Sequence, residues 1–275
     1  MNLAIKLPSA AAWVAGAMLW ATGAPAQAED AAQSQDRPDR LVMVGLGPRL
    51  EPSYPGSSRT SIGVAPVVNV WSEDQSLPVE TPDEGKGPTL LGTRNASAAG
   101  LTFAFAPQRG SETATQGLRK VGFGIEAGLF AESYVLPGVR LRAEARHAIG
   151  AHAALVGDAA LDLVLRSKRN DRAMLTLGPR VRFGSGGYNR RYYGIEPGEA
   201  VASGLAPYRP DAGIHAVGAV AGAHWPIDSR WGLFGFAGYD RLVGPAASSP
   251  LVKTRGRADQ INAGLALTYV FRIKR

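Results

Sequence analysis

The stretch Val139-Arg140-Leu141-Arg142-Ala143-Glu144-Ala145-Arg146 alternates between two kinds of side chain at every step. Its odd positions are apolar or small, and its even positions are all charged. A helix would distribute the four charges around its circumference, whereas a β-strand places all four on one face. The stretch therefore predicts a strand with one apolar and one charged face.

The same period of two recurs along the chain. Leu161, Leu163 and Leu165 share one face, opposite Asp162 and Arg166. Ten candidate strands follow from this pattern, at 41–51, 62–71, 88–106, 120–134, 138–149, 152–166, 172–184, 212–225, 230–243 and 258–272. If 88–106 is a hairpin and one strand has been missed, the number becomes twelve.

Two architectures produce such alternation. In a soluble sandwich the charged face meets water, whereas in a membrane barrel the apolar face meets lipid and the charged face lines the interior. Many candidate strands run to ten residues or more, as tilted membrane strands do. Aromatic residues near segment ends are typical of interfacial girdles; they are Trp71, Tyr134, Trp225, Trp231, Tyr239, Tyr269 and Phe271. We therefore predict an all-β fold, a transmembrane antiparallel β-barrel over 41–275.

The first 28 residues resemble a secretory signal peptide. Lys6 provides a positive start, an apolar run follows from Ala10 to Gly23, and Ala26-Gln27-Ala28 fits a cleavage site. The alternative, a membrane anchor, requires about 20 apolar residues, more than this run provides. Residues 29–40 are polar and charged and are expected to form a disordered lead-in. Export and the barrel pattern together predict the outer membrane of a Gram-negative bacterium.

Composition limits the remaining choices. The chain has no cysteine, so neither disulfides nor thiolate metal sites are available. Its 34 glycines are spread throughout and argue against long helices. The net charge of +7 could suggest nucleic acid, but the arginines are dispersed along alternating segments and the chain is expected to be exported. We expect no nucleic-acid partner.

The predicted interior carries charges of both signs. The charged positions assigned to it are Arg140, Arg142, Glu144, Arg146, Asp162, Arg166, Arg180 and Arg182, with Glu126, Glu132 and Asp158 on neighbouring strands. A slight excess of arginine would suit a narrow channel for small anionic solutes. Alternatively, the two signs pair and fill the interior, as in small barrels. We favour a filled or narrow interior.

Long connections are expected on the outside of the cell and short turns on the periplasmic side. The long stretches are 107–119, 185–211 and 244–257, and the short ones are 136–138, 167–171 and 226–229. The connection 72–87 is long, yet this scheme places it on the periplasmic side. Segment 184–211 is rich in the residue types of binding hot spots; its candidates are Tyr188, Arg190, Arg191, Tyr192, Tyr193 and Tyr208. It could instead cap the barrel, and both interpretations stay open.

Catalysis and metal binding find little support in the sequence. His147 and His152 flank a turn, and His215 and His224 lie nine residues apart, without the spacing of a metal site. Ser185-Gly186-Gly187 is followed by no helix pattern and no Lys-Ser/Thr pair, so it does not predict a phosphate-binding loop. No nucleophile-elbow motif is present. We expect no catalytic residue, metal or cofactor.

The C-terminal half resembles a known family in specific residues as well as in its alternating pattern. The residues that carry the resemblance are Tyr192-Tyr193-Gly194-Ile195, Ser203-Gly204-Leu205, Tyr208, Gly213, Trp231, Leu242, Ser249-Pro250-Leu251-Val252 and Tyr269-Val270-Phe271, with Glu51-Pro52-Ser53-Tyr54-Pro55-Gly56-Ser57 nearer the N-terminus. This set is similar to the MipA/OmpV family of outer-membrane proteins. The resemblance covers most of 41–271 and is most specific over 188–271.

The resemblance implies a small, monomeric outer-membrane barrel with a structural or scaffolding role. Its expected partners are membrane lipid and periplasmic murein enzymes, namely a lytic transglycosylase and a murein synthase. Other members of the family are associated with adhesion or envelope stress, so an adhesin acting through the outer loops is a further alternative. One departure is that Phe271 is followed by Arg272-Ile273-Lys274-Arg275, whereas such barrels usually end on the aromatic residue.

Overall fold

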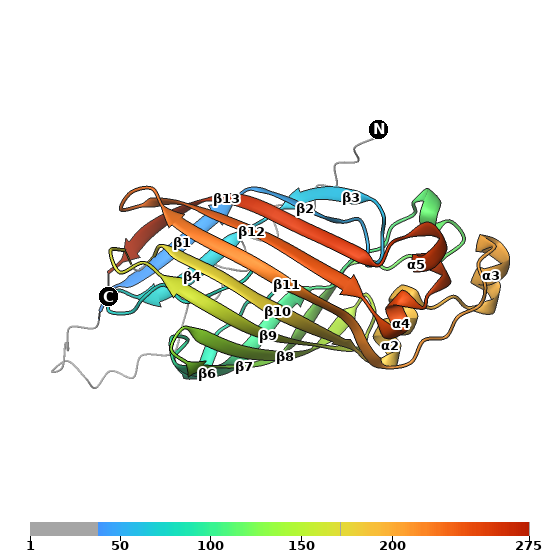
Figure 1. The fold of residues 1–275 in the computed structure, drawn as a ribbon, viewed down its shortest axis with the longest axis horizontal. Coiled ribbons are helices and arrows are strands. Elements are labelled where there is room, and N and C mark those ends of the chain that lie inside the picture. The colour runs from blue at the N-terminus through green and yellow to red at the C-terminus, as the bar shows by residue number, and fades with distance from the viewer. Residues whose placement is uncertain (1–37, 171, 275) are drawn as a thin grey trace, which may run out of the picture.

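The computed structural model describes residues 38–170 and 172–274, so the expected signal peptide (1–28) and nearly all of the expected lead-in (29–40) lie outside the described residues. The described chain forms thirteen strands in one sheet (Figure 1). The strands are β1 (Arg40–Leu46), β2 (Pro48–Pro52), β3 (Thr60–Val64), β4 (Val67–Ser72), β5 (Thr89–Gly92), β6 (Ser97–Phe105), β7 (Gly124–Leu136), β8 (Val139–Gly150), β9 (Leu155–Arg166), β10 (Met174–Gly184), β11 (Gly213–Pro226), β12 (Trp231–Leu242) and β13 (Asp259–Ile273).

Short helices occupy several of the connections. They are η2 (Thr113–Thr115), α2 (Gly186–Tyr193), α3 (Pro197–Ser203), α4 (Gly244–Ala247) and α5 (Pro250–Arg255). None of the helices in the described part of the chain has the length and apolar character required to span a membrane. The prediction of an all-β architecture is confirmed, although the long connections hold more helix than the sequence pattern indicated.

Antiparallel neighbours follow chain order through most of the sheet. Strands β5 to β13 pair consecutively, β13 then pairs with both β1 and β2, and these pair with β4 and β3. The last strand therefore lies beside the first, with Arg40 opposite Ile273. Figure 1 shows the strands curving around a common interior, with β1 to β4 behind β9 to β13. Strands β3 and β5 are the two ends of the order.

Thirteen strands replace the ten that the alternation predicted, because three expected strands are each divided in two. The segment 41–51 is interrupted at Gly47, where a Cβ would lie 1.8 Å from the Leu265 carbonyl oxygen. The segment 62–71 is interrupted at Pro66, which has no N–H to donate to a ladder. The segment 88–106 is a hairpin of β5 and β6, as the alternative interpretation allowed.

Burial along the strands confirms that the charged face points inward. On β8, Arg140 is 0% exposed and Arg142 is 2% exposed, whereas Leu141 between them is 45% exposed. The large apolar side chains of β9 and β10 are exposed in the same way, with Leu163 at 45% and Leu177 at 54%. The sheet is therefore inverted relative to a water-soluble protein, with ions inside and apolar groups outside.

The connection between β4 and β5 is the main departure from the predicted arrangement. The sequence analysis placed 72–87 on the periplasmic side, but the structure folds this segment into the interior. Leu77, Val79 and Thr81 are each 1% exposed. Val79 packs with Val164 and Met174 on the inward faces of β9 and β10. We call residues 77–87 the internal segment.

The connections divide between two ends of the molecule (Figure 1). One end holds the start of β1, the end of β13, the tight turns at 137–138 and 227–230, and the connection from β9 to β10. The opposite end holds α2 to α5 and η2. We call these the turn end and the helical end. The three short connections named above thus lie at the end that carries both chain termini of the sheet, as predicted, whereas the short connection 151–154 between β8 and β9 lies at the helical end.

Candidate functional site: a charged interior and a capped helical end

Arg140 is the most completely enclosed member of the charged face on β8. Its Nη2 donates to Asp162 Oδ2 at 2.9 Å on β9 and to Glu84 of the internal segment. Its Nη1 lies 3.3 Å from Glu132 Oε2 on β7 and donates to the Val79 carbonyl at 3.1 Å. One guanidinium therefore joins three strands to the internal segment.

The next two arginines on β8 continue the pattern. Arg142 Nη1 donates to Glu132 Oε2 at 2.7 Å, and its Nε donates to Glu144 Oε1 at 2.7 Å. Arg146 Nη2 donates to Asp158 Oδ2 on β9 at 2.6 Å. Because β7, β8 and β9 are adjacent, the carboxylate partners of these arginines lie on a neighbouring strand or two residues away on β8 itself.

Strand β10 extends the network toward the other side of the interior. Arg180 lies 2.8 Å from Asp83 Oδ2 and 2.8 Å from Asp162 Oδ1. Arg182 lies 3.2 Å from the same Asp83 oxygen and 3.1 Å from Asp240 on β12. Asp83 therefore pairs with two arginines at once and anchors the internal segment against β10.

These contacts form one interior ion-pair network. Its cations are Arg94, Arg140, Arg142, Arg146, Arg180 and Arg182, and its anions are Glu80, Asp83, Glu84, Glu126, Glu132, Glu144, Asp158, Asp162 and Asp240. Every guanidinium in it has a carboxylate within 4.0 Å. The expected excess of arginine is absent from this network, because the internal segment adds three carboxylates and β12 adds a fourth.

Arg166 is the one predicted interior charge that lies elsewhere. It is half-buried at the turn end, where Nη2 donates to Asn95 Oδ1 at 3.3 Å. Seven of the eight predicted interior charges thus lie together in the network. The sequence analysis missed Glu80, Asp83 and Glu84, which occupy a segment without strand alternation.

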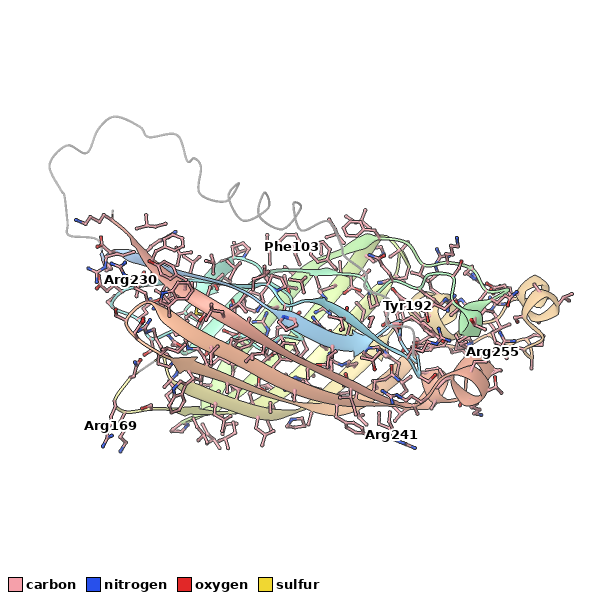
Figure 2. All side chains as sticks on the ribbon, turned by 90° about the horizontal axis from the view of Figure 1, so that it is seen from above. Phe103, Arg169, Tyr192, Arg230, Arg241 and Arg255 are labelled. Carbon is pink, nitrogen blue, oxygen red and sulfur yellow. The ribbon has the colours of Figure 1, made fainter. Side chains whose placement is uncertain are left out.

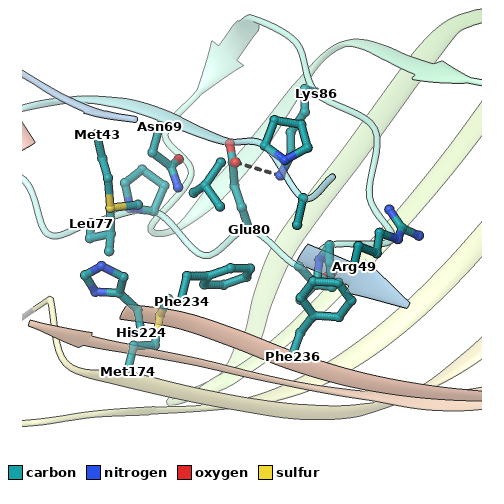
Figure 3. A pocket seen from close by; sticks show the side chains of 16 residues that line it. Met43, Arg49, Asn69, Leu77, Glu80, Lys86, Met174, His224, Phe234 and Phe236 are labelled. Carbon is teal, nitrogen blue, oxygen red and sulfur yellow. Dashed lines mark hydrogen bonds and ion pairs between the residues drawn. The ribbon is translucent and has the colours of Figure 1, made fainter. Parts of the chain in front are cut away.

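A cavity of about 60 Å³ lies between the internal segment and the inward faces of β1, β4 and β12 (Figure 3). Met43, Leu77, Phe234 and Phe236 give it largely apolar walls. His224 contributes no free ring nitrogen, because Nδ1 lies 2.7 Å from the Arg172 carbonyl oxygen and Nε2 lies 3.2 Å from Thr268 Oγ1. A space of this size holds a few water molecules and offers no passage for a larger solute.

The helical end is closed mainly by aromatic side chains. Tyr188, Tyr192 and Tyr193 of α2 are each at most 5% exposed. The Tyr188 ring lies 5.0 Å from His152 and 4.9 Å from His215 between ring centroids. We call these five residues the aromatic cap. Three of the expected outer-loop binding candidates therefore pack inside the protein, a correction that favours the capping interpretation of 184–211.

The other loop candidates remain nearer the surface. Arg190 and Arg191 are half-buried, and Tyr208 donates its hydroxyl to the Pro245 carbonyl at 2.9 Å. Helix α2 begins directly after Ser185, although no helix pattern was recognised there in the sequence. Tyr188 and Tyr192 are four residues apart and share one face of the helix. This spacing is the sequence signal from which a helix could have been predicted.

A buried arginine ties two connections of the helical end together. Arg109 is 1% exposed and has no carboxylate partner within the described residues. It donates from Nη1 to the Tyr192 carbonyl at 2.7 Å and from Nη2 to the Arg119 carbonyl at 2.8 Å. Burial lowers the pKa of Arg109 to about 10. No sequence pattern predicted this residue, because its partners are backbone carbonyls.

Two of the histidines, His152 and His215, both contact the Tyr188 ring, and His224 lies by the cavity on β11. His152 and Glu126 are 3.0 Å apart through Nε2 and Oε1, and His215 lies in the aromatic cap. Within residues 38–170 and 172–274, no group of three or more His, Cys, Asp or Glu side chains is arranged to hold a metal ion.

Comparison with known proteins adds one finding. A family model described as "MltA-interacting protein MipA" matches residues 44–271, which includes every strand from β2 to β12, most of β13 and the last three residues of β1. No curated protein matches the chain.

Proposed function

The chain belongs to the MltA-interacting protein MipA family, and from this premise we propose that it is an outer-membrane protein that docks a murein-remodelling enzyme. The observation that supports the location is the inverted sheet, with the interior ion-pair network inside and large apolar side chains outside. The family name supports the kind of partner, a murein lytic transglycosylase, with a murein synthase as a second candidate.

The outward face has the chemistry of a lipid-facing surface. Contiguous apolar side chains of this extent are rare on soluble monomers, because exposing them to water costs about 25 cal/mol for each Å². Lipid removes that cost. Trp225 and Trp231 lie toward one end of the apolar belt and Phe123 toward the other, at 70%, 43% and 59% exposed. Such positions are typical of the aromatic girdles that mark the two membrane surfaces.

The fold also supports an orientation. In outer-membrane barrels short turns and both termini face the periplasm, and longer connections face outward. The turn end therefore faces the periplasm, where murein enzymes act. The protein acts as a monomer whose surrounding lipid covers the apolar belt, and docking takes place at the turn end. We propose no enzymatic activity.

Co-purification tests the scaffold role. The mature protein with a C-terminal affinity tag is extracted from envelopes in mild detergent, and co-purifying proteins are compared with those of an unrelated barrel of similar size. We expect a lytic transglycosylase to be enriched at least several-fold over the control. Equal recovery from both proteins would contradict the scaffold role and leave the membrane location unaffected.

The alternatives receive less support from the geometry. A channel for anions needs unpaired cations along an open path, but the guanidiniums of the network all have carboxylate partners and the internal segment fills the space between strands. An adhesin needs exposed hot-spot residues, but Tyr188, Tyr192 and Tyr193 are buried. Planar-bilayer recordings test the channel directly, and we expect no arginine-dependent current.

A further inference from the structure

Two neighbouring turns of the turn end are fastened to each other. Arg172 in the turn 167–173 donates from Nη1 to the Ser229 carbonyl at 3.0 Å and from Nη2 to the Asp228 carbonyl at 3.1 Å. The carboxylate of Asp228 accepts the backbone N–H groups of Arg230 and Trp231, both at 2.7 Å. These hydrogen bonds hold the two turns side by side. We call residues 167–173 and 227–230 together the paired turns.

The paired turns carry an excess of positive charge. Their sequence contains Lys168, Arg169, Arg172 and Arg230 against two aspartates, a formal net charge of +2. Lys168, Arg169 and Arg230 are exposed, and none of the three forms an ion pair within the described residues. Figure 2 shows Arg169 and Arg230 at the same end of the molecule.

One further cation at the turn end, Arg272, differs in this respect. Arg272, which follows Phe271 on β13, pairs with Glu73 and lies 3.9 Å from Asp39. Its charge is therefore balanced by the start of β1 and the end of β4. The Asp228 oxygen that binds the backbone is likewise engaged within its own turn. Arg40 and Lys274 are also exposed at this end and form no ion pair within the described residues, so the paired turns add three unpaired cations to an end that already carries positive charge.

An apolar and aromatic surface adjoins these cations directly. Trp225 is 70% exposed, Ile227 is 57% exposed and Trp231 is 43% exposed. Trp231 is held edge-on against Tyr269, with ring centroids 4.8 Å apart, and Arg230 Nη1 donates to the Tyr269 hydroxyl at 3.4 Å. Indole rings beside guanidinium groups combine an apolar body with polar hydrogen-bond donors.

We propose that the paired turns bind an anionic phospholipid, with Lys168, Arg169 and Arg230 contacting its phosphate and the tryptophans contacting its glycerol and upper acyl chains. An acidic protein would be attracted by the cations but would not account for indole rings left exposed beside them. A phospholipid matches both halves of the surface. This inference rests on the proposed membrane location and adds a ligand to its periplasmic face.

Intrinsic fluorescence provides a direct probe. If the expected signal peptide is removed, the mature chain retains Trp71, Trp225 and Trp231, so two of its three tryptophans lie at the proposed site. Trp71 is 4% exposed and is shielded from lipid. The mature protein is reconstituted into mixed vesicles of phosphatidylcholine and phosphatidylglycerol. In one set the phosphatidylglycerol is brominated, and in the other set the phosphatidylcholine is brominated. The quenching curves give the relative binding constant of the two lipids.

We expect the wild-type protein to favour phosphatidylglycerol by about tenfold or more, since each basic residue near a membrane surface contributes on the order of a fivefold preference for anionic lipid. The triple variant Lys168→Gln, Arg169→Gln, Arg230→Gln should reduce the preference to near unity. The double variant Lys168→Gln, Arg169→Gln, which leaves the turn 227–230 intact, should give an intermediate value.

A matched control removes the same charge at the helical end. Lys120, Arg209 and Lys253 are exposed there and form no ion pair within the described residues, so Lys120→Gln, Arg209→Gln, Lys253→Gln should keep the wild-type preference. Equal quenching by the two lipids in the wild-type protein, or an equal loss in the control, would overturn the lipid site. Absence of quenching by either lipid would overturn the membrane location and this inference together.

A further outcome separates lipid from protein. If the triple variant keeps its phosphatidylglycerol preference but no longer co-purifies a transglycosylase, the paired turns are a protein-docking surface and the lipid proposal fails. If it loses the preference while co-purification persists, the lipid proposal stands and docking uses another part of the turn end.

Discussion

The middle of the molecule and its helical end are both well buried, but they are filled by opposite chemistry. In the middle, the interior ion-pair network places charged side chains such as Arg140 and Arg180 at 2% exposure or less. At the helical end, the aromatic cap buries tyrosine rings to the same degree, with Tyr192 and Tyr193 at 1%. The two regions therefore exclude water equally and differ in how their contacts depend on one another.

The difference teaches where the fold is vulnerable. A buried charge is tolerable only while its counter-charges remain, so deleting one member of the network leaves the others unpaired. Aromatic packing is closer to additive, because each ring contributes its own buried area and leaves no uncompensated charge when it is trimmed. Single substitutions should therefore cost more in the interior than in the aromatic cap.

The largest effect is expected for Arg140→Ala. This change leaves Glu84, Glu132 and Asp162 without their common partner in a space that excludes water. We expect a loss of about 3–5 kcal/mol in the free energy of unfolding. Urea titration of the protein in detergent micelles or vesicles, followed by the heat-modifiable shift in electrophoretic mobility, measures it.

Leu141→Ala is the matched control, since the neighbouring side chain points outward and is 45% exposed. It should cost about 1 kcal/mol or less, because it shortens an outward-facing apolar side chain and leaves no unpaired charge behind. If both variants lose the same stability, the interior network contributes no more than an ordinary surface contact, and the contrast drawn above fails.

The strand pattern accounts for how far the sequence alone predicts this interior. Alternation over 139–146 assigns each side chain to a face, and period-two segments flanking it identify β7, β9 and β10. Because one apolar surface and one charged surface leave no freedom of register, seven of the eight predicted interior charges lie in the network. Alternation does not predict the strand interruptions at Gly47 and Pro66. The first depends on the close approach of Gly47 to the Leu265 carbonyl, and the second on the missing N–H of Pro66.

The next largest effect is expected for Asp83→Asn in the internal segment. The amide keeps the shape of the carboxylate but not the charge that Arg180 and Arg182 share. Arg180 keeps Asp162, and Arg182 keeps Asp158 and Asp240. The loss should therefore be about 2 kcal/mol, smaller than that for Arg140→Ala. The same urea titration measures it, and limited proteolysis should cleave the variant faster within 77–87.

Asp74→Asn changes an exposed aspartate just before the internal segment and should alter neither stability nor cleavage. If the Asp83→Asn variant resists proteolysis as well as the wild-type protein does, the apolar contacts of Leu77 and Val79 are sufficient to hold the internal segment in place. The network would then be a consequence of the segment's position and not its anchor.

A smaller effect is expected in the aromatic cap. The Tyr192 hydroxyl donates to the Pro107 carbonyl at 2.6 Å, so Tyr192→Phe removes one hydrogen bond and keeps the ring. The expected loss is about 1 kcal/mol. Tyr193→Phe is its control, because the ring lies in the same cap while no hydrogen bond of its hydroxyl is present within the described residues. A loss above that of Asp83→Asn would reverse the order of the two regions.

The helical end is also the region that sequence reasoning predicted least. Helix α2 has only two turns, and its tyrosines were interpreted as loop residues because their buried face is completed by His152 and His215 from distant strands. Arg109 binds carbonyls and so leaves no charge pattern. The position of the internal segment was not predicted for a related reason. Its acidic residues follow no periodic pattern, and their arginine partners are far away in sequence.

The smallest effect is expected for a partly solvent-accessible ion pair at the helical end, which can be compared with the buried ion pairs of the interior network. Glu199 of α3 accepts hydrogen bonds from the Arg119 side chain at 2.9 and 2.8 Å and from the Arg119 backbone N–H at 2.7 Å. Burial alone would raise the pKa of Glu199, but these hydrogen bonds and one from the Glu196 backbone lower it from 4.5 to about 2. The ionised form is therefore the one that the folded protein stabilises.

A lowered folded-state pKa adds stability that is fully present above the ordinary value near 4.5 and is lost as the pH falls through about 2. Amide hydrogen exchange across 111–121 should therefore accelerate over this window, whereas Glu199→Gln should exchange faster already at neutral pH and change little on acidification. Exchange in β8 reports the interior for comparison. If β8 and 111–121 accelerate together, protonation of the buried network loosens the whole protein first, and the exposed pair has no separate part in holding the helical end.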